Sequence, residues 1–318
     1  MASCRWWSKE NVALVTGANT GIGFAIVKIL AQQGLSVVLT CRSIQNGQKA
    51  VDMMREEGLD VAFHQLDVTD PESIIRLSKW VGDQFGGIDI LINNAGISIR
   101  TSPLSSDSME FAHSLLRTNY YGAKSVIEAM LPLFRHSPAG NRIINVSSVA
   151  GQLSILRDEA WKRQLSSVDS LTEDIINSFL QNCLFKFEEN LPKNVSGLDV
   201  IEANLHYPNG VVFYSVSKAA LNAYTAMLAR NLVETPQDQK KFFVNCMCPG
   251  LTSTRMSGNV GHSPEEGADT AVWLALLPAS ECPTGKFFRK RQERSTDYVE
   301  ELFEEMQIIR NGSRRQKE

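Results

Sequence analysis

Short apolar runs alternate with helix-like stretches along most of this chain of 318 residues. Strands that alternate with helices predict an α/β protein with a parallel, doubly wound sheet and right-handed crossovers. In such a sheet, ligands bind beyond the carboxyl ends of the strands. The predicted strands are VALVT (12–16), SVVLTCR (36–42), AFHQLDV (62–68), IDILINNAG (88–96), RIINVSS (142–148) and FFVNCMCPG (242–250). The helices predicted between them cover residues 24–34, 46–58, 70–86, 111–134 and 214–232.

Two segments break this alternation, which divides the chain into one domain over residues 1–290, with a helical insertion at 152–210, and a tail at 291–318. In the insertion, Ser170 and Glu173 have the spacing of a capping box at the start of a helix over 170–191. Apolar residues on one side of that helix predict packing on the sheet, which is compatible with a role as a wall of a substrate cleft. In the tail, YVEELFEEMQII (298–309) predicts a helix that docks on the body or on an adjacent chain, with partner binding as the alternative.

The overall composition excludes several classes of function. A net charge of −3 argues against nucleic-acid binding by bulk electrostatics. No segment has the roughly 20 consecutive apolar residues that a membrane span needs, and the start of the chain lacks the apolar run of a signal peptide. The five histidines and six cysteines form no metal-binding pattern, so no metal is expected. These features predict a soluble, cytoplasmic protein.

Three glycines lie in TGANTGIG (16–23), between the first predicted strand and its helix. Gly17, Gly21 and Gly23 permit a tight turn, and the helix start offers free N–H groups and a positive dipole end to a phosphate. The spacing is G-x-x-x-G-x-G, and its place in the first strand–helix turn favours a dinucleotide.

The end of the second strand refines the choice of dinucleotide. NAD sites usually place Asp or Glu there, whereas LTCRS (39–43) has no acid and carries Arg42, which could hold a 2′-phosphate. We therefore expect NADP(H) rather than NAD(H), with a solvent-exposed arginine as the alternative. Asp67, at the end of the third strand, could bond an adenine amino group or act as an ordinary turn residue.

Two tyrosine–lysine pairs have the spacing that places both side chains on one helical face: Tyr214 with Lys218, and Tyr120 with Lys124. A nearby ammonium group favours the phenolate and lowers a tyrosine pKa, typically by ~1–3 units, which suits the tyrosine to proton transfer. Tyr214 lies near the start of its helix, at the ligand-binding edge of the sheet. Tyr120 lies midway along a helix, so we expect it to pack in the core or at an interface.

The ordered motifs resemble those of the short-chain dehydrogenase/reductase family, and the resemblance covers roughly residues 10–290. The matching segments are TGANTGIG, LDV (66–68), NNAG (93–96), Asn119 in RTNYYG, NVSS (145–148), YSVSK (214–218) and CPG (248–250). The long insertion between Ser148 and Tyr214 resembles that of the carbonyl reductase subgroup. The resemblance implies a Rossmann-type single domain, NADPH or NADP⁺ as cofactor, and a leaning to a monomer.

The resemblance also implies a role for individual residues. In the implied tetrad, Tyr214 is the general acid, Ser148 orients the substrate carbonyl, Lys218 lowers the tyrosine pKa and binds the nicotinamide ribose, and Asn119 positions a relay water. The complete set of expected cofactor contacts is Gly17, Asn19, Thr20, Gly21, Ile22, Gly23, Arg42, Asp67, Val68, Asn94, Ala95, Gly96, Tyr214, Lys218, Pro249, Gly250 and Thr252. Relatives often carry Lys where this chain has Thr20 and a second basic residue at Asn46, so phosphate charge would rest mainly on Arg42.

The expected activity is NADPH-dependent reduction of ketone, aldehyde or quinone carbonyls of a small molecule to alcohols, with hydride from the nicotinamide and a proton from Tyr214. One alternative is a non-catalytic NADPH-binding sensor or scaffold. Another is a narrow biosynthetic reductase for steroid, retinoid or alkaloid-like ketones.

Overall fold

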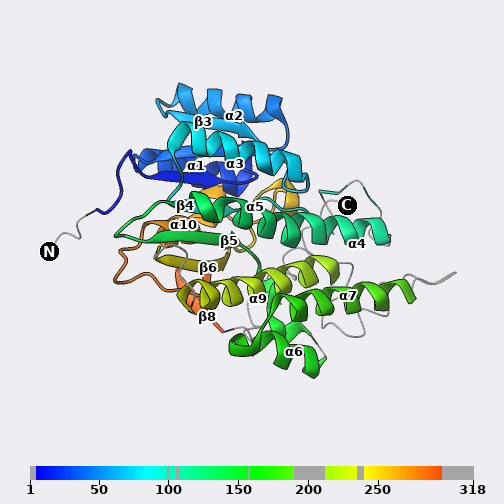
Figure 1. Cartoon of the computed structure of the whole chain (residues 1–318). Coiled ribbons are helices and arrows are strands. Elements are labelled where there is room, and N and C mark those ends of the chain that lie inside the picture. Colours follow the sequence, from blue (N-terminus) through cyan, green and yellow to red (C-terminus); the bar gives the residue numbers. More distant parts are fainter. Residues whose placement is uncertain are drawn as a thin grey trace.

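One twisted sheet with helices on both faces forms the body of the molecule (Figure 1). The computed structural model describes residues 5–98, 101, 102, 104, 108–156, 158–189, 212–234 and 240–295. Within them, eight strands form a sheet in the order β3-β2-β1-β4-β5-β6-β7-β8. Neighbouring strands pair in parallel from β3 to β7, and β7 pairs with β8 in antiparallel fashion. The strands are β1 (Val12–Val15), β2 (Ser36–Cys41), β3 (Val61–Gln65), β4 (Ile90–Asn93), β5 (Asn141–Val146), β6 (Phe242–Cys248), β7 (Phe287–Arg289) and β8 (Gln292–Arg294).

This topology confirms the predicted doubly wound α/β fold. The strand order reverses direction at β1, because β2 lies on one side of β1 and β4 on the other. Such a switch point opens a crevice at the carboxyl ends of the strands, where ligands bind in sheets of this kind. The alternation of strand side chains explains the two faces: Leu14 belongs to one core layer, whereas Ala13 and Val15 belong to the other.

The two helical layers follow from this alternation. One core layer joins the sheet to α1 (Gly21–Gln32), α2 (Ile44–Glu56) and α10 (Pro264–Leu276). The other joins it to α3 (Pro71–Phe85), α4 (Met109–Leu116), α5 (Ala123–Met130) and α9 (Val212–Glu234).

The single helix predicted over residues 111–134 is wrong in detail. Between α4 and α5, residues Arg117–Gly122 form a π-helical segment, η1, and a short 3-10 turn, Leu131–Leu133, follows α5. At Gly122 the segment approaches Val68 so closely that a Cβ would lie 2.8 Å from Val68 Cγ2. Single π-turns inside helices occur often at functional sites, and η1 carries Asn119.

The insertion forms α6 (Glu159–Ser166) and α7 (Glu173–Glu189). The predicted helix over 170–191 is present, but it begins at Glu173, and Thr172 rather than Ser170 accepts from a first-turn amide, the Ile175 N–H at 3.3 Å. Helix α7 packs on the helices α4 and α9 rather than on the sheet as predicted, and the Phe187 ring lies 5.0 Å from the Phe213 ring. Residues 190–211 and the predicted tail helix at 298–309 lie outside the described residues.

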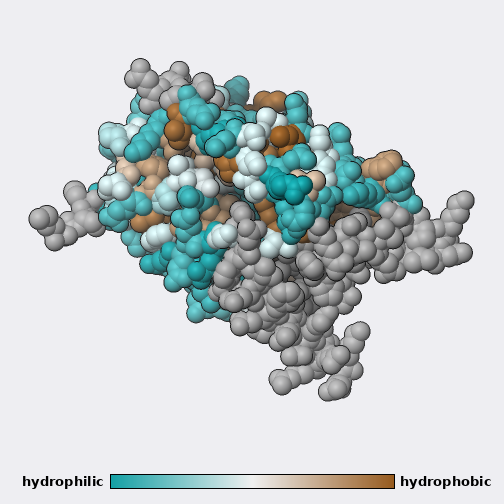
Figure 2. All heavy atoms as spheres, turned by 90° about the horizontal axis from the view of Figure 1, so that it is seen from below, coloured by the Kyte–Doolittle hydropathy of each residue, from teal (hydrophilic) through white to brown (hydrophobic). Residues whose placement is uncertain are grey.

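The surface carries hydrophobic residues in separate places. In Figure 2 the hydrophobic patches lie between hydrophilic residues on the face seen from below. Small apolar patches of this kind are ordinary for a protein surface. Among the described helices, none is both long and apolar enough to cross a membrane.

The hairpin of β7 and β8 was not predicted. Its two turn residues, Lys290 and Arg291, have φ angles of 50° and 59°. Two-residue hairpin turns usually place Gly or Asn at such positions. The Lys-Arg pair therefore gave no signal of a turn.

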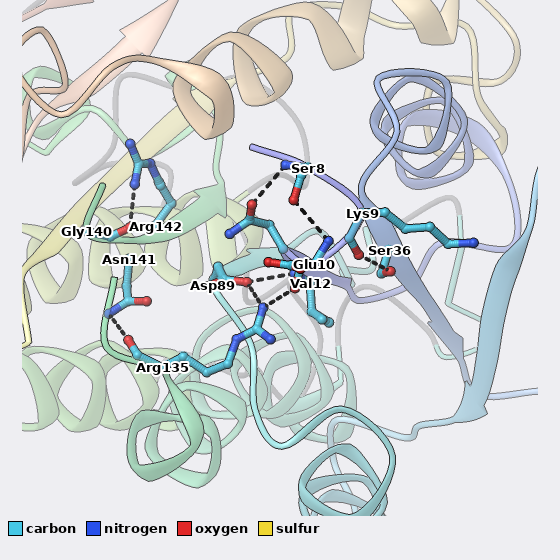
Figure 3. A network of polar contacts seen from close by, with 11 residues as sticks. Ser8, Lys9, Glu10, Val12, Ser36, Asp89, Arg135, Gly140, Asn141 and Arg142 are labelled. Atoms are coloured by element: carbon cyan, nitrogen blue, oxygen red, sulfur yellow. Dashed lines mark hydrogen bonds and ion pairs between the residues drawn. The ribbon is translucent and has the colours of Figure 1, made fainter. Parts of the chain in front are cut away.

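A buried carboxylate ties the N-terminal segment to the amino ends of the strands (Figure 3). Asp89, whose side chain is 3% exposed, accepts a hydrogen bond of 2.7 Å from the Val12 N–H and forms an ion pair with Arg135. Arg135 in turn donates to the Glu10 carbonyl at 2.6 Å. Because the carboxylate is desolvated, its partners are needed to compensate its charge.

We expect Asp89→Ala to lower the free energy of unfolding by about 3 kcal/mol, since it leaves the Val12 N–H without its acceptor and Arg135 without its carboxylate partner. Urea unfolding measures the change. Asp52→Ala is the control, because Asp52 pairs with Arg55 where both side chains are more than half exposed (51% and 69%), and such pairs contribute about 0–1 kcal/mol. Equal losses in the two variants would contradict this account of the network.

Candidate active site

The glycine turn after β1 fits closely against the loop that follows β4. Gly17 has a φ of 64°, and a Cβ there would lie 2.7 Å from the Ala95 Cα. A Cβ on Gly23 would lie 2.5 Å from Asn94 Nδ2 and 2.8 Å from the Ala18 Cα. Both positions therefore require glycine for steric reasons. The close approach also shows that Gly17 and Gly23 lie against Ala95 and Asn94, which are all predicted cofactor contacts.

Hydrogen bonds hold this turn and the β4 loop in register. Asn94 Nδ2 donates to the Thr16 and Gly17 carbonyls, each at 3.0 Å. The Thr16 hydroxyl accepts from the backbone N–H groups of Asn94 and Ala95, also at 3.0 Å. Thr16 was not among the predicted site residues; its position directly before Gly17, at the end of a buried strand, was the available signal.

The start of α1 is suited to an anion. Thr20 is the N-cap residue, but its side chain caps no N–H group, and no acidic side chain lies in the first turn. The N–H groups and the positive dipole end of the helix therefore stay available to a phosphate. Across the turn, a Cβ on Gly21 would lie 3.1 Å from Thr254 Cγ2, in the loop between β6 and α10. Together with the close approach at Gly17 and Gly23, this geometry fits the pyrophosphate of a dinucleotide.

Arg42 and Asp67 follow two neighbouring parallel strands, β2 and β3. Arg42 is exposed, and its guanidinium forms no ion pair with the described residues. Asp67 Oδ1 accepts from the N–H and the hydroxyl of Thr69, at 2.9 and 2.7 Å. Asp67 is thus a turn residue, as the alternative interpretation had it, and its contact with adenine stays a prediction.

The loop after β6 brings the last of the predicted contacts to the same edge. Gly250 has a φ of 75°. The Thr252 hydroxyl, in a residue only 4% exposed, donates to the Pro249 and Gly250 carbonyls at 3.3 and 3.2 Å. The turn is therefore fixed by its own hydrogen bonds.

Lys218 lies buried beside the β4 loop. It is 5% exposed, and its Nζ donates to the Val146 carbonyl at 2.9 Å. A Cβ on Gly96 would lie 3.8 Å from this nitrogen, and the Tyr214 ring centroid lies 5.7 Å from it. Burial lowers the pKa of Lys218 to about 8, because desolvation disfavours the ammonium form. Lys218 thus lies beside the NNAG loop, with the Tyr214 ring next to its ammonium group.

Asn119 is held by the same loop. Its Oδ1 accepts from the Ile97 N–H at 2.8 Å, and its Nδ2 donates to the Ile97 carbonyl at 3.0 Å. The π-helical segment η1 therefore carries a side chain that makes two hydrogen bonds with Ile97, the residue after NNAG.

Ser148 begins a short turn that packs on α9. Its hydroxyl accepts from the Ala150 N–H at 3.1 Å. A Cβ on Gly151, at the end of that turn, would lie 2.5 Å from the Lys218 carbonyl carbon. Asn222 Nδ2 also donates to the Gly151 carbonyl at 3.0 Å. These contacts fix the Ser148 turn against the helix that carries Tyr214 and Lys218.

The second tyrosine–lysine pair has a different environment. Tyr120 is fully buried, its ring packs edge-on against Tyr224 at 6.0 Å, and burial raises its pKa. Lys124 instead pairs with Glu128 at 2.7 Å and with Glu173 of α7 at 3.0 Å. The predicted packing role of Tyr120 is confirmed.

Residues 11–160 match the family model described as short chain dehydrogenase. The chain is 39% identical over 303 residues to (+)-neomenthol dehydrogenase of Arabidopsis thaliana, with 88% of this chain and 96% of that protein covered. The chain belongs to the short-chain dehydrogenase/reductase family. It is also 36% identical over 288 residues to carbonyl reductase 1 of Mus musculus, whose name specifies NADPH, with 90% and 98% covered.

Solved structures agree with this family assignment. The salutaridine reductase of Papaver somniferum superposes with a TM-score of 0.75 at 36% identity, covering 87% of this chain and 99% of that one. The protein is accordingly a carbonyl-reductase-like oxidoreductase of this family, which acts on carbonyl or CH–OH groups with a nicotinamide cofactor.

Proposed function

We propose that this protein uses NADPH to reduce ketone, aldehyde or quinone carbonyls of small molecules to alcohols. The observation that carries the proposal is the buried Lys218 ammonium, which lies beside Gly96 and next to the Tyr214 ring. This ammonium group links Tyr214 to the loop after β4, which packs on the glycine turn. The names of the relatives support the same chemistry.

The bound nicotinamide supplies the hydride in this proposal. Tyr214 donates the proton to the substrate oxygen, and Ser148 donates a hydrogen bond that orients the carbonyl. The Lys218 charge stabilises the phenolate that forms when Tyr214 gives up its proton. Because the Asn119 Nδ2 already donates to the Ile97 carbonyl and to a second acceptor, a relay water would be held by an acceptor atom of Asn119 rather than by its N–H groups.

The cofactor contacts proposed for this site follow the glycine turn and the strand ends. The N–H groups around Thr20, Gly21 and Ile22 would bind the pyrophosphate, with Asn19 in the same turn. Val68 and Asp67 would lie along the adenine, and Thr252 near the nicotinamide. Arg42 would bind the 2′-phosphate that distinguishes NADPH from NADH.

We expect Arg42→Ala to raise the KM for NADPH by about 10- to 100-fold, since a hydrogen bond to a charged group contributes about 1.5–3 kcal/mol. The KM for NADH should change by less than about twofold, because NADH lacks that phosphate. Initial rates with each cofactor measure the effect. A parallel rise in both KM values would contradict the assignment of Arg42.

The activity itself is tested by following NADPH absorbance at 340 nm with the purified full chain. Cyclohexanone, benzaldehyde and menadione represent the ketone, aldehyde and quinone classes. Turnover of several of them supports the proposal. Tight NADPH binding without turnover of any carbonyl compound, including larger ones, would favour the sensor or scaffold alternative.

A narrow biosynthetic specificity is the second candidate within the same chemistry. Two plant relatives are named for single compounds, (+)-neomenthol and salutaridine, and this favours a terpenoid-like or alkaloid-like ketone. Turnover confined to one bulky cyclic ketone would support it.

The packing of α7 on α4 and α9 covers faces of both helices, which supports the further proposal that the protein is a monomer.

A further inference from the structure

Ser217 lies between Tyr214 and Lys218 on α9 and is completely buried. Its hydroxyl donates to the Tyr214 carbonyl at 2.7 Å. It also accepts a hydrogen bond of 3.1 Å from Asn119 Nδ2, on the separate segment η1. One hydroxyl thus joins the first turn of the helix that carries the proton donor to the π-helical segment.

The bond to Tyr214 alone would be unremarkable, because serine hydroxyls in helices commonly bond the carbonyl one turn back. The bond from Asn119 differs, because it links two elements that are distant in the sequence. It also uses one of the two hydrogens of the Asn119 amide nitrogen. An amide nitrogen has two hydrogens; in Asn119 one goes to the Ile97 carbonyl and the other to Ser217.

Without the Ser217 hydroxyl, one N–H of Asn119 would lose its acceptor in a side chain that is only 1% exposed. A buried donor without a partner is unfavourable, so the amide would turn to find another acceptor. Turning would break the bond from the Ile97 N–H to Asn119 Oδ1. The orientation of Asn119 therefore depends on the hydroxyl of Ser217.

We propose that Ser217 is a positioning residue of the reductase. Its hydroxyl holds the Asn119 amide in a fixed orientation relative to the first turn of α9, which carries Tyr214. Its importance for turnover rests on the proposed function. Its hold on Asn119 does not, and the two parts can be tested separately.

Ser217→Ala removes the hydroxyl with little change in volume. The first measurement is amide hydrogen exchange at Ile97, whose N–H donates to Asn119 Oδ1. We expect exchange at Ile97 to become at least about tenfold faster in this variant, as the amide loses its fixed acceptor.

Thr225→Val is the matched control. The Thr225 hydroxyl, on the same helix and 1% exposed, also donates to a carbonyl one turn back (Leu221, 2.7 Å) and accepts from an asparagine amide (Asn145, 2.9 Å). It lies about 12 Å further along α9, at 1.5 Å per residue. Thr225→Val should lower the free energy of unfolding by about as much as Ser217→Ala and should leave the rate of amide exchange at Ile97 unchanged.

The second measurement is steady-state kinetics with NADPH and a carbonyl compound that the wild type reduces. Ser217→Ala should lower kcat by about tenfold or more through misplacement of reacting groups, with the KM for NADPH within about twofold of wild type. Thr225→Val should keep wild-type kcat, and Ser217→Thr, which keeps the hydroxyl, should recover part of the lost kcat.

Unchanged Ile97 exchange in Ser217→Ala, or equal changes in Ser217→Ala and Thr225→Val, would overturn the proposal. Faster exchange with unchanged kcat would also overturn it, because the hold on Asn119 would then have no effect on the reaction. If the wild type reduces no carbonyl compound, the proposed function fails, and the exchange measurement alone decides whether Ser217 holds Asn119.

Discussion

Tyr214→Phe is expected to lower kcat for carbonyl reduction by about 10²- to 10⁴-fold, the range that a positioned general acid contributes. The substitution removes the hydroxyl that would protonate the substrate oxygen and keeps the ring beside Lys218 Nζ. Because the glycine turn and the β4 loop are untouched, NADPH affinity should stay within about twofold of wild type. Initial rates and a titration of NADPH fluorescence measure the two quantities.

Tyr120→Phe is the matched control, because Tyr120 and Lys124 have the same spacing as Tyr214 and Lys218. In the described part of the chain, the buried Tyr120 hydroxyl has no hydrogen-bond partner, so its removal should leave both stability and kcat near wild type. Full activity in Tyr214→Phe together with loss in Tyr120→Phe would reverse the assignment.

Gly23→Ala is expected to weaken NADPH binding by at least about 100-fold and to lower the free energy of unfolding by about 1–3 kcal/mol, the usual effect of overpacking. The new Cβ would lie 2.5 Å from Asn94 Nδ2 and 2.8 Å from the Gly17 carbonyl oxygen. Either the side chain of Asn94 or the glycine turn must then move, and the hydrogen bonds of Asn94 to Thr16 and Gly17 are lost. Fluorescence titration and urea unfolding measure the two effects.

Gly82→Ala provides the control for this change inside a helix. A Cβ at Gly82, in α3, would lie 3.7 Å from Leu133 Cδ2, an ordinary contact. Alanine there should raise the free energy of unfolding by about 0.5–1 kcal/mol, since glycine is unfavourable within helices, and should leave NADPH binding unchanged. Unaltered NADPH affinity in Gly23→Ala would show that this close approach does not shape the cofactor site.

Strands β1 to β6 were predictable because they depend on local signals. Each of these six strands is a short apolar run, and the turn glycines mark where strand gives way to helix. The position of Tyr214 near a helix start, and of Tyr120 within a helix, also decided correctly which of the two tyrosines packs in the core.

The features that were missed depend on contacts between distant residues. The π-helical turn carrying Asn119 packs at Gly122 against Val68, which is distant in the sequence, and no local pattern in RTNYYG signals it. The Lys290–Arg291 turn lacks the usual turn residues. The roles of Thr16 and Ser217 became visible only when their hydroxyls were found between two elements, because serine and threonine are common at strand ends and on helices.

The most direct test of the account uses NADPH that carries deuterium at both C4 positions of the nicotinamide, with a carbonyl compound that the protein reduces. Mass spectrometry of the alcohol should show one deuterium on the former carbonyl carbon, with the wild type and with Tyr120→Phe, and almost no alcohol with Tyr214→Phe. An alcohol without deuterium, or equal yields of labelled alcohol from wild type and Tyr214→Phe, would contradict the account.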